Sequence, residues 1–146
     1  ASARGTKLAF DSNYRPRLWR SVEEAREVTG QFGALASIVL PSRADEEALF
    51  ADHGPRAIAA RWLEVGVEEV VVKDGASAAW LMTSGQTEIV PAQPAGEVID
   101  TTAAGDSFNG TYLARRLLGD ELGDAAEAAH RTAVRVIGYR GAIVPG

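Results

Sequence analysis

One stretch of this chain decides its fold: Asp100-Thr101-Thr102-Ala103-Ala104-Gly105-Asp106-Ser107-Phe108-Asn109-Gly110. Apolar, strand-like runs come before it, and residues 111–118 after it have the composition of a helix. Its small residues, Ala103, Ala104 and Gly105, therefore lie where a loop enters a helix. The first N–H groups of a helix have no acceptor within the helix, and the helix dipole places partial positive charge there. Because Ala and Gly carry no large side chain, a phosphate can approach these backbone groups directly.

A carboxylate, Asp106, stands in the first turn of the same predicted helix. Beside a bound phosphate its charge is repulsive, so the arrangement is poor for binding alone. It suits a general base that accepts the proton of an attacking hydroxyl group. The alternative is an ordinary helix start with a capping Thr and an acidic first turn, which is common in α/β proteins.

The whole string resembles the second signature of the ribokinase-like (phosphofructokinase-B type) carbohydrate kinases, Asp-Thr-x-Gly-Ala-Gly-Asp-x-Phe. The resemblance implies that Asp106 is the catalytic base. It also implies that the amides of Ala103, Ala104 and Gly105 hold the ATP phosphates and the charge that develops on the transferring phosphoryl group. Ala103 replaces the first Gly of the family's Gly-Ala-Gly-Asp core. We expect this Ala to be tolerated if its φ is negative, because the groups used are backbone N–H.

Composition limits the classes of protein that this chain can be. Its 146 residues make at most one domain, and a hydrophobic content of 46% is enough for a core. No apolar run is long enough to span a bilayer, and the net charge of −5 argues against a nucleic-acid partner. The absence of Cys excludes disulfides and thiolate metal sites and fits a reducing cytoplasm, which is the expected location. We expect neither a nucleic acid nor a membrane among its partners.

Strand-like and helix-like runs alternate along the chain, which predicts an α/β fold with a mainly parallel sheet flanked by helices. Expected strands are 7–11, 36–40 and 69–73, with a hairpin of 79–82 and 87–90. Expected helices are 22–31 after the cap Ser21, one starting at Ser42, 56–65 after Pro55, the helix after the 100–110 stretch, and 124–137. Glu46 and Glu47, on the second of these helices, are expected to be solvated charges.

The first predicted strand leads into a polar loop, Asp11-Ser12-Asn13-Tyr14-Arg15-Pro16-Arg17-Leu18-Trp19. Polar groups at the carboxyl end of a parallel strand point into the crevice where α/β sheets bind ligands. The pattern Asp-x-Asn-x-Arg-x-x-Leu-Trp is similar to a loop of fructokinases and 2-keto-3-deoxygluconate kinases, whose Asn and Arg reach the nucleotide phosphates or the sugar. On that likeness we expect Asn13 to contact ATP and Arg15 to contact the substrate, with the ATP phosphates as the alternative partner of Arg15. The alternative is a surface loop with Trp19 as an aromatic plug.

Two further loops resemble parts of the family's site. Lys73 and Gly75 match the Lys-x-Gly-x-x-Gly loop beneath the nucleotide, although Ala stands where the last Gly is usual. Ser42-x-x-Asp45 occupies the place of an Asn-x-x-Glu that helps to organise Mg²⁺ through water. The resemblance therefore implies ATP contacts for Lys73 and Gly75 and a water-mediated metal contact for Asp45.

His130 lies on the Ala-rich helix 124–137, whose small side chains permit close packing against the helix after the 100–110 stretch. In the resembling family this helix borders the adenine pocket, so His130 is a candidate ATP contact. A lone His on a helix is more often a surface or core residue, and that alternative stays open.

Taken together, the resemblance implies a kinase in which ATP and Mg²⁺ serve to phosphorylate a primary hydroxyl of 2-keto-3-deoxygluconate. The tail 139–145 is more similar to that group than to fructokinases. A fructokinase or other neutral-sugar kinase is the alternative, as is a catalytically silent nucleotide-binding fragment. Dependence on a monovalent cation and assembly into a homo-oligomer are left open. The family's N-terminal Gly-Gly sugar motif and its lid have no counterpart here, so residues 1–146 are expected to be the C-terminal part of a single kinase domain and to be inactive alone.

Overall fold

A computed structural model describes residues 6–142 and 144 of the chain. Five strands form one sheet in the order β1-β2-β3-β4-β5. The strands are β1 Ala9–Phe10, β2 Ile38–Val39, β3 Glu69–Asp74, β4 Ala78–Met82 and β5 Thr87–Pro91. The helices are the 3-10 turn η2 Pro16–Leu18, α1 Val22–Gly33, α2 Arg43–Phe50, α3 Pro55–Glu64, α4 Ala104–Leu117 and α5 Leu122–Ile137. The predicted α/β class is confirmed.

The sheet is parallel in its first half. Strand β2 pairs in parallel with β1 and with β3, with Ile38 opposite both Ala9 and Glu69. The connections from β3 to β4 and from β4 to β5 have three and four residues, which are too short for a crossover, so these strands run antiparallel. The predicted hairpin is present, and its turn is closed by the N–H of Thr83 donating to the carbonyl oxygen of Gln86 over 2.9 Å. The sheet is therefore mixed, and β1 to β3 form its parallel part.

The chain divides into two compact units, and each is described by itself. Unit 1 comprises Ala1–Gly75 with Trp80–Thr87, and unit 2 comprises Ala76–Ala79 with Glu88–Gly146. Strands β4 and β5 contribute residues to both units.

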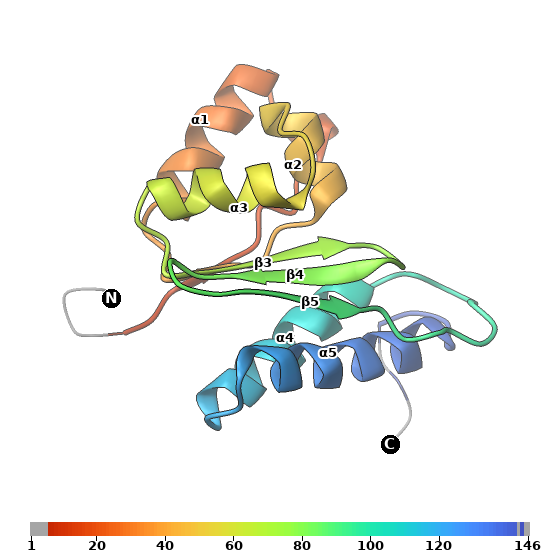
Figure 1. Ribbon diagram of the computed structural model, residues 1–146. Coiled ribbons are helices and arrows are strands. Elements are labelled where there is room, and N and C mark those ends of the chain that lie inside the picture. Colours follow the sequence, from red (N-terminus) through yellow and green to blue (C-terminus); the bar gives the residue numbers. More distant parts are fainter. Residues whose placement is uncertain (1–5, 143, 145–146) are drawn as a thin grey trace. The chain divides into compact units, whose positions relative to one another are not determined.

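The core of unit 1 is built around Trp62 of α3. Val70, Val71 and Val72 are fully buried, which explains the continuous β-branched run of β3. The Trp62 ring meets the Phe50 ring edge-on, with 5.9 Å between the ring centroids. A Cβ on Gly33, the last residue of α1, would lie 2.2 Å from the Trp62 ring, so only Gly allows α1 to pack here. Helices α1, α2 and α3 accordingly lie close together in Figure 1.

Helix starts in unit 1 follow the predicted capping chemistry. The Ser21 hydroxyl accepts from the Glu24 N–H (3.1 Å), and the Ser42 hydroxyl accepts from the Asp45 N–H (3.2 Å). Pro55 is the first residue of α3, as predicted. The two Ser caps act over three positions, and Pro55 favours a first helical position through its fixed φ, although no side chain caps α3. These signals are local, and this is why the sequence alone located the three helix starts.

The expectation of solvated charges on α2 was wrong. Glu46 is fully buried, with an exposed fraction of 0%. Glu47 is half-buried, and its Oε1 accepts from Arg43 Nε (2.7 Å) and from the Gly54 N–H (3.0 Å). The packing of α2 against α3 turns Glu46 inward, where Arg61 and Trp62 donate to it.

Unit 2 consists mainly of α4 and α5, which pack side by side (Figure 1). Phe108 and Tyr112 of α4 are buried, with stacked rings 6.2 Å apart. The prediction that α5 packs against α4 through small side chains is confirmed for α5. Its buried residues are Leu122, Ala125, Ala126, Ala129, His130 and Val136. The uniform Ala composition of the helix hides the boundary of its inner face.

Within the described residues, no helix is long and apolar enough to cross a membrane. Of the tail whose similarity pointed to 2-keto-3-deoxygluconate kinases, Ile143 and Pro145 lie outside the described residues.

Candidate active site

The stretch from Asp100 to Gly110 forms a loop and the start of α4, as predicted. Ala103 is the N-cap, and Asp106 is the third helical residue and is exposed. In the described part of the chain no side chain caps this helix, so the alternative of a capping Thr is not supported. Instead, the Ala104 N–H donates to the Thr101 carbonyl oxygen over 3.2 Å and closes a turn that leads into the helix.

The backbone of Ala103 does not meet the condition of a negative φ. Its φ is 60° and its ψ is 12°, which is the left-handed region. A side chain in this region costs roughly 1–2 kcal/mol, whereas Gly adopts it freely. The turn at 101–103 imposes the conformation, and this explains why the family's signature has Gly at the position.

The start of α4 offers backbone donors to an anion. By the geometry of a helix start, the N–H groups of Gly105 and Asp106 have no acceptor on a preceding turn. Gly105 is exposed, so these groups are accessible. The Ala104 N–H already donates to Thr101, and an anion would have to share it. The assignment of Ala103, Ala104 and Gly105 as phosphate-binding residues remains a prediction that the geometry permits.

Asp100 anchors this loop, a role that the sequence did not reveal. Its Oδ1 accepts from the Thr102 N–H (2.8 Å), and its Oδ2 accepts from the Gly141 N–H (2.9 Å). Hydrogen bonds from the Thr102 hydroxyl, the Gly141 N–H and the Thr102 N–H lower the pKa of Asp100 to about 2. Asp100 therefore stays ionised at neutral pH and ties the loop to the segment after α5.

His130 lies inside unit 2. Its exposed fraction is 6%, and its Nε2 is 3.2 Å from the Val90 carbonyl oxygen. The Phe108 ring meets it edge-on, with 5.0 Å between the ring centroids. Burial lowers the pKa of His130 more than the Val90 hydrogen bond raises it. These contacts favour the core-residue alternative, and the nucleotide contact stays an untested prediction.

In unit 1, charged groups gather after the parallel strands. Asp11 follows β1 and Lys73 lies on β3, and Lys73 Nζ is 2.8 Å from Asp11 Oδ2. The Lys73 N–H donates to the Pro41 carbonyl oxygen after β2 over 2.9 Å. Because the parallel strands end at the same edge of the sheet, residues 62 positions apart form one ion pair.

Asn13 and Arg15 lie on the loop that follows Asp11, and both are exposed. The Asn13 N–H donates to Asp11 Oδ1 over 3.2 Å, and Asn13 has a left-handed φ of 37°. Arg15 donates from one guanidinium nitrogen to the Tyr14 carbonyl oxygen (2.9 Å), and the same nitrogen is 3.7 Å from Asp45 Oδ2.

Two aromatic residues hold this loop in place. The Tyr14 side chain is buried with Ala25 and Leu49, and Trp19 packs against the same cluster. The interpretation of Trp19 as an aromatic plug is confirmed.

Gly75 follows β3 with a φ of 54°, a conformation that favours Gly. Its neighbour Asp74 accepts from a guanidinium nitrogen of Arg43 over 3.2 Å. The turn after β3 is thereby tied to the start of α2. The predicted residues Asn13, Arg15, Asp45, Lys73 and Gly75 all belong to unit 1, whereas Ala103 to Asp106 and His130 belong to unit 2.

The described residues contain no group of three or more side chains that could form a metal cage. Magnesium bound with a nucleotide needs only one or two carboxylates, because phosphates and water complete its shell. Asp45 fits such a water-mediated role, since its carboxylate is partly exposed and is balanced by Arg15.

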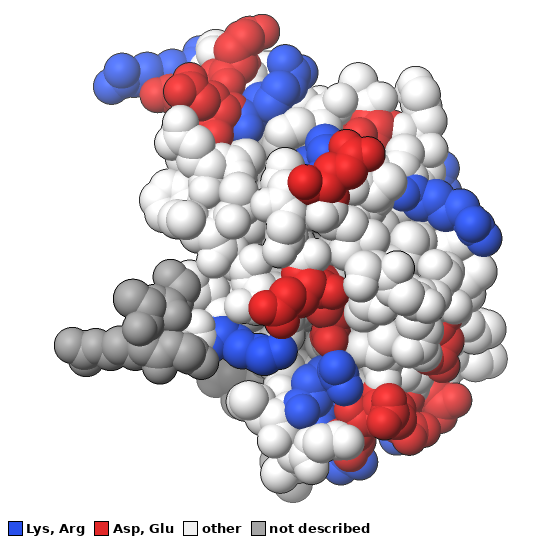
Figure 2. All heavy atoms as spheres, turned by 60° about the vertical axis from the view of Figure 1, so that its left-hand side comes forward, with Lys and Arg blue, Asp and Glu red and all other residues white. Residues whose placement is uncertain are grey.

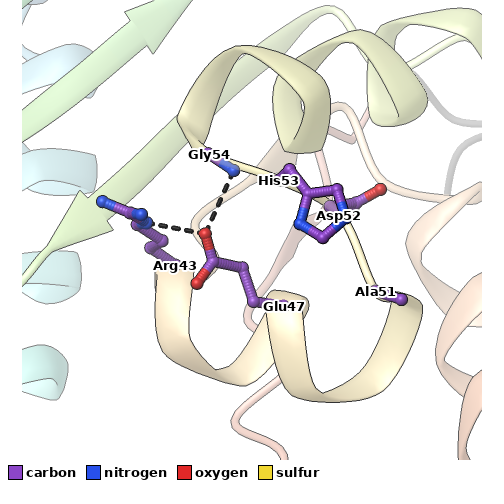
Figure 3. A pocket seen from close by; sticks show the side chains of 6 residues that line it. All are labelled: Arg43, Glu47, Ala51, Asp52, His53 and Gly54. Atoms are coloured by element: carbon purple, nitrogen blue, oxygen red, sulfur yellow. Dashed lines mark hydrogen bonds and ion pairs between the residues drawn. The ribbon is translucent and has the colours of Figure 1, made fainter.

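A surface hollow in unit 1 contains none of the predicted site residues. Figure 3 shows its lining, which is Arg43, Glu47, Ala51, Asp52, His53 and Gly54. Hydrogen bonds from Arg43 and from the Gly54 N–H lower the pKa of Glu47. Glu47 is paired with Arg43 inside the hollow, whereas Asp52 is paired with Arg61, which does not line it. On the face shown in Figure 2, acidic and basic side chains of the described residues are likewise interspersed.

Comparison with known proteins places this chain among carbohydrate kinases. The model of the pfkB family of carbohydrate kinases matches residues 1–145. A 2-dehydro-3-deoxygluconokinase of Escherichia coli (strain K12) is 47% identical, over 98% of this chain and 47% of that protein. The chain thus spans about half the length of this relative.

Two of the solved structures that share the fold are kinases for an aminoimidazole riboside and for fructose. Aminoimidazole riboside kinase from Salmonella enterica, in complex with aminoimidazole riboside and an ATP analogue, superposes with a TM-score of 0.85 at 26% identity, over 97% of this chain and 49% of that one. Fructokinase from Vibrio cholerae O395, with fructose, ADP and calcium bound, has a TM-score of 0.83 at 26% identity, over 93% and 46%.

Proposed function

The chain belongs to the pfkB family of carbohydrate kinases, and from this premise we propose that it forms the C-terminal part of an ATP-dependent kinase for 2-keto-3-deoxygluconate. The observation that carries the proposal is the 47% identity to a 2-dehydro-3-deoxygluconokinase over 98% of the chain. The two substrate names denote the same sugar acid. Half of that relative has no counterpart here, so we propose that residues 1–146 alone do not phosphorylate sugars.

In the proposed reaction Asp106 is the general base. It is exposed on the first turn of α4, where a substrate hydroxyl can reach it. Its carboxylate accepts the proton of the primary hydroxyl while the hydroxyl oxygen bonds to the γ-phosphorus of ATP, and the bond from that phosphorus to the β–γ bridging oxygen breaks to release ADP. The N–H groups at the start of α4 donate to the oxygens of the transferring phosphoryl group and stabilise its charge.

The nucleotide and the metal are assigned to loops of unit 1. We propose that Asn13, Lys73 and Gly75 contact ATP, and that Asp45 holds Mg²⁺ through water. Magnesium supplies charge neutralisation at the phosphates. Lys73 is already paired with Asp11 at 2.8 Å, whereas Asp45 lies 3.7 Å from the Arg15 guanidinium.

Substrate class is assigned to Arg15. Its guanidinium can offer two parallel N–H donors to the carboxylate of a sugar acid, which a neutral sugar cannot match. A second candidate, a kinase for a neutral sugar, is favoured by one observation: Asp45 already stands 3.7 Å from the Arg15 guanidinium and competes for it.

Assay of the full-length protein with ATP and a panel of sugars and sugar acids tests the activity. Arg15→Leu tests the substrate class, because a charge-assisted hydrogen bond is worth roughly ten- to a hundredfold in affinity. We expect kcat/KM for the sugar acid to fall by about that factor, with little change for a neutral sugar. Arg17→Leu, an exposed neighbour in the same loop, is the matched control. If Arg15→Leu instead raises the KM for ATP and impairs every sugar alike, Arg15 binds the nucleotide.

A further inference from the structure

Glu46 of unit 1 has a buried carboxylate that takes no part in the proposed reaction. Its Oε2 accepts from Trp62 Nε1 over 3.0 Å and from a guanidinium nitrogen of Arg61. Arg61 also donates to Asp52 over 2.9 Å, and its guanidinium lies 3.7 Å from the Phe50 ring centroid. One oxygen of Glu46 is therefore fully engaged by α3.

The other oxygen has a complement close by. In the described part of the chain, Glu46 Oε1 and Ser12 Oγ are the buried side-chain oxygens without a hydrogen-bond partner. Burial raises the pKa of Glu46, and the Ser12 hydroxyl is the neighbour that most strongly opposes this rise. A hydroxyl can rotate to donate its proton, and a carboxylate oxygen can accept it. Since buried polar groups are almost always paired, each of these atoms supplies what the other lacks.

Ser12 lies within the loop that carries the proposed ligand contacts. On one side is Asp11, which pairs with Lys73, and on the other is Asn13 with its left-handed φ of 37°. A non-glycine residue in that region is uncommon and needs its surroundings to hold it there. The Asn13 N–H bond to Asp11 holds the loop from one side. A bond from Ser12 would hold it from the interior.

We propose that Ser12 donates to Glu46, and that this pair positions the 11–15 loop so that Asn13 and Arg15 face their ligands. Glu46 is thus a positioning residue that acts through Ser12, with α3 as its fixed support. This inference rests on the proposed function for what the loop binds. The hydrogen bond between Ser12 and Glu46 does not depend on the proposed function.

The experiment uses Ser12→Ala in the full-length protein, with Ser12→Thr as the variant that keeps a hydroxyl. Loss of one buried hydrogen bond corresponds to roughly three- to tenfold in affinity. We expect Ser12→Ala to raise the KM for ATP or for the sugar by about that factor while kcat changes by less than about twofold. Ser12→Thr should restore most of the loss. Ser84→Ala, an exposed Ser in the β4–β5 turn, should leave both constants unchanged.

Two readouts do not depend on catalysis or on identifying the sugar. Hydrogen exchange of a peptide covering residues 11–19 should become faster in Ser12→Ala, while exchange in 43–49 of α2 stays the same. The effects of Ser12→Ala and Glu46→Gln on that exchange should also be less than additive, because the two residues share one interaction. Unchanged exchange in 11–19, or fully additive effects, would overturn the inference. If the wild-type protein phosphorylates no sugar, the proposed function fails, and the exchange data still decide the role of Ser12.

Discussion

Two polar loops of this molecule differ in the groups that they offer to a ligand. The helix-entry loop, residues 100–106 of unit 2, offers backbone N–H groups and one exposed carboxylate, Asp106. The strand-end loop, residues 11–19 of unit 1, works with side chains whose charges are already paired, as in Lys73 with Asp11 and Arg15 with Asp45. The helix-entry loop is formed by consecutive residues of the sequence. The charge pairs of the strand-end loop form only when strands distant in the sequence pack side by side. That loop is therefore sensitive to changes in packing.

The largest expected effect tests the chemistry of the helix-entry loop. Asp106→Asn keeps the shape of the side chain and removes the proton acceptor, so turnover by the full-length enzyme should fall by at least about 10²-fold. ATP affinity should persist or increase, because a repulsive charge is lost. Steady-state kinetics with an ATP titration measure both. Asp124→Asn, in the first turn of α5, is the matched control. Near-normal turnover in Asp106→Asn would remove the residue from the role of base.

The next effect concerns the interior behind the strand-end loop. Arg61→Met keeps the side-chain stem but leaves Glu46 buried without its cation, and breaking a buried pair in this way costs about 3 kcal/mol or more. Denaturant unfolding of the full-length protein measures it. Arg56→Met, an exposed Arg on the same helix, should change the free energy of unfolding by less than about 1 kcal/mol.

The loss in Arg61→Met should depend on pH. Burial raises the pKa of Glu46, and removal of Arg61 raises it further. When folding raises the pKa of an acid, its contribution to the free energy of unfolding is fully present below the pKa of the unfolded state. That contribution is lost as the pH rises through the pKa of the folded state. The destabilisation should therefore be larger at pH 8 than at pH 5. A loss that does not vary with pH would mean that the charge of Glu46 is not its cause.

A smaller effect tests the backbone of the helix-entry loop. Ala103→Gly removes the side chain from a left-handed position but adds freedom to the unfolded chain, so we expect a net stabilisation of up to about 1 kcal/mol. Ala104→Gly, one residue later at a helical position, should destabilise instead. Unfolding of both variants in parallel provides the measurement. Equal destabilisation by the two would contradict the left-handed conformation of Ala103.

The smallest effect is a pH dependence within unit 2. Burial lowers the pKa of His130, so its stabilising contribution is present above its unfolded pKa and is lost as the pH falls through the lower folded pKa. The denaturation midpoint should therefore decrease less between pH 7 and pH 5 in His130→Gln than in the wild type. His53→Gln changes an exposed His and should leave this pH dependence as it is. An identical decrease in all three proteins would show that His130 does not titrate with unfolding.

Local chemistry in the sequence was enough for the helix starts at Ser21, Ser42 and Pro55, for the buried strand β3, and for the family. Each of these depends on residues within a few positions of one another or on a simple pattern. The same holds for the place of Asp106 on the first turn of α4. Where the local residues alone determine the backbone conformation, the structure can be predicted without knowing which residues pack around it.

Tertiary structure alone decided the rest. Glu46 looks like any exposed helix charge until α3 brings Arg61 and Trp62 against it. Asp100 becomes an anchor only when the segment after α5 returns to it, and the φ of Ala103 is set by the turn that closes there. The pairing of Lys73 with Asp11 joins residues 62 positions apart, and no local pattern encodes such a contact. Burial and charge pairing are properties of the folded neighbourhood, because the cost of burying a charge is settled by the partners that the fold supplies.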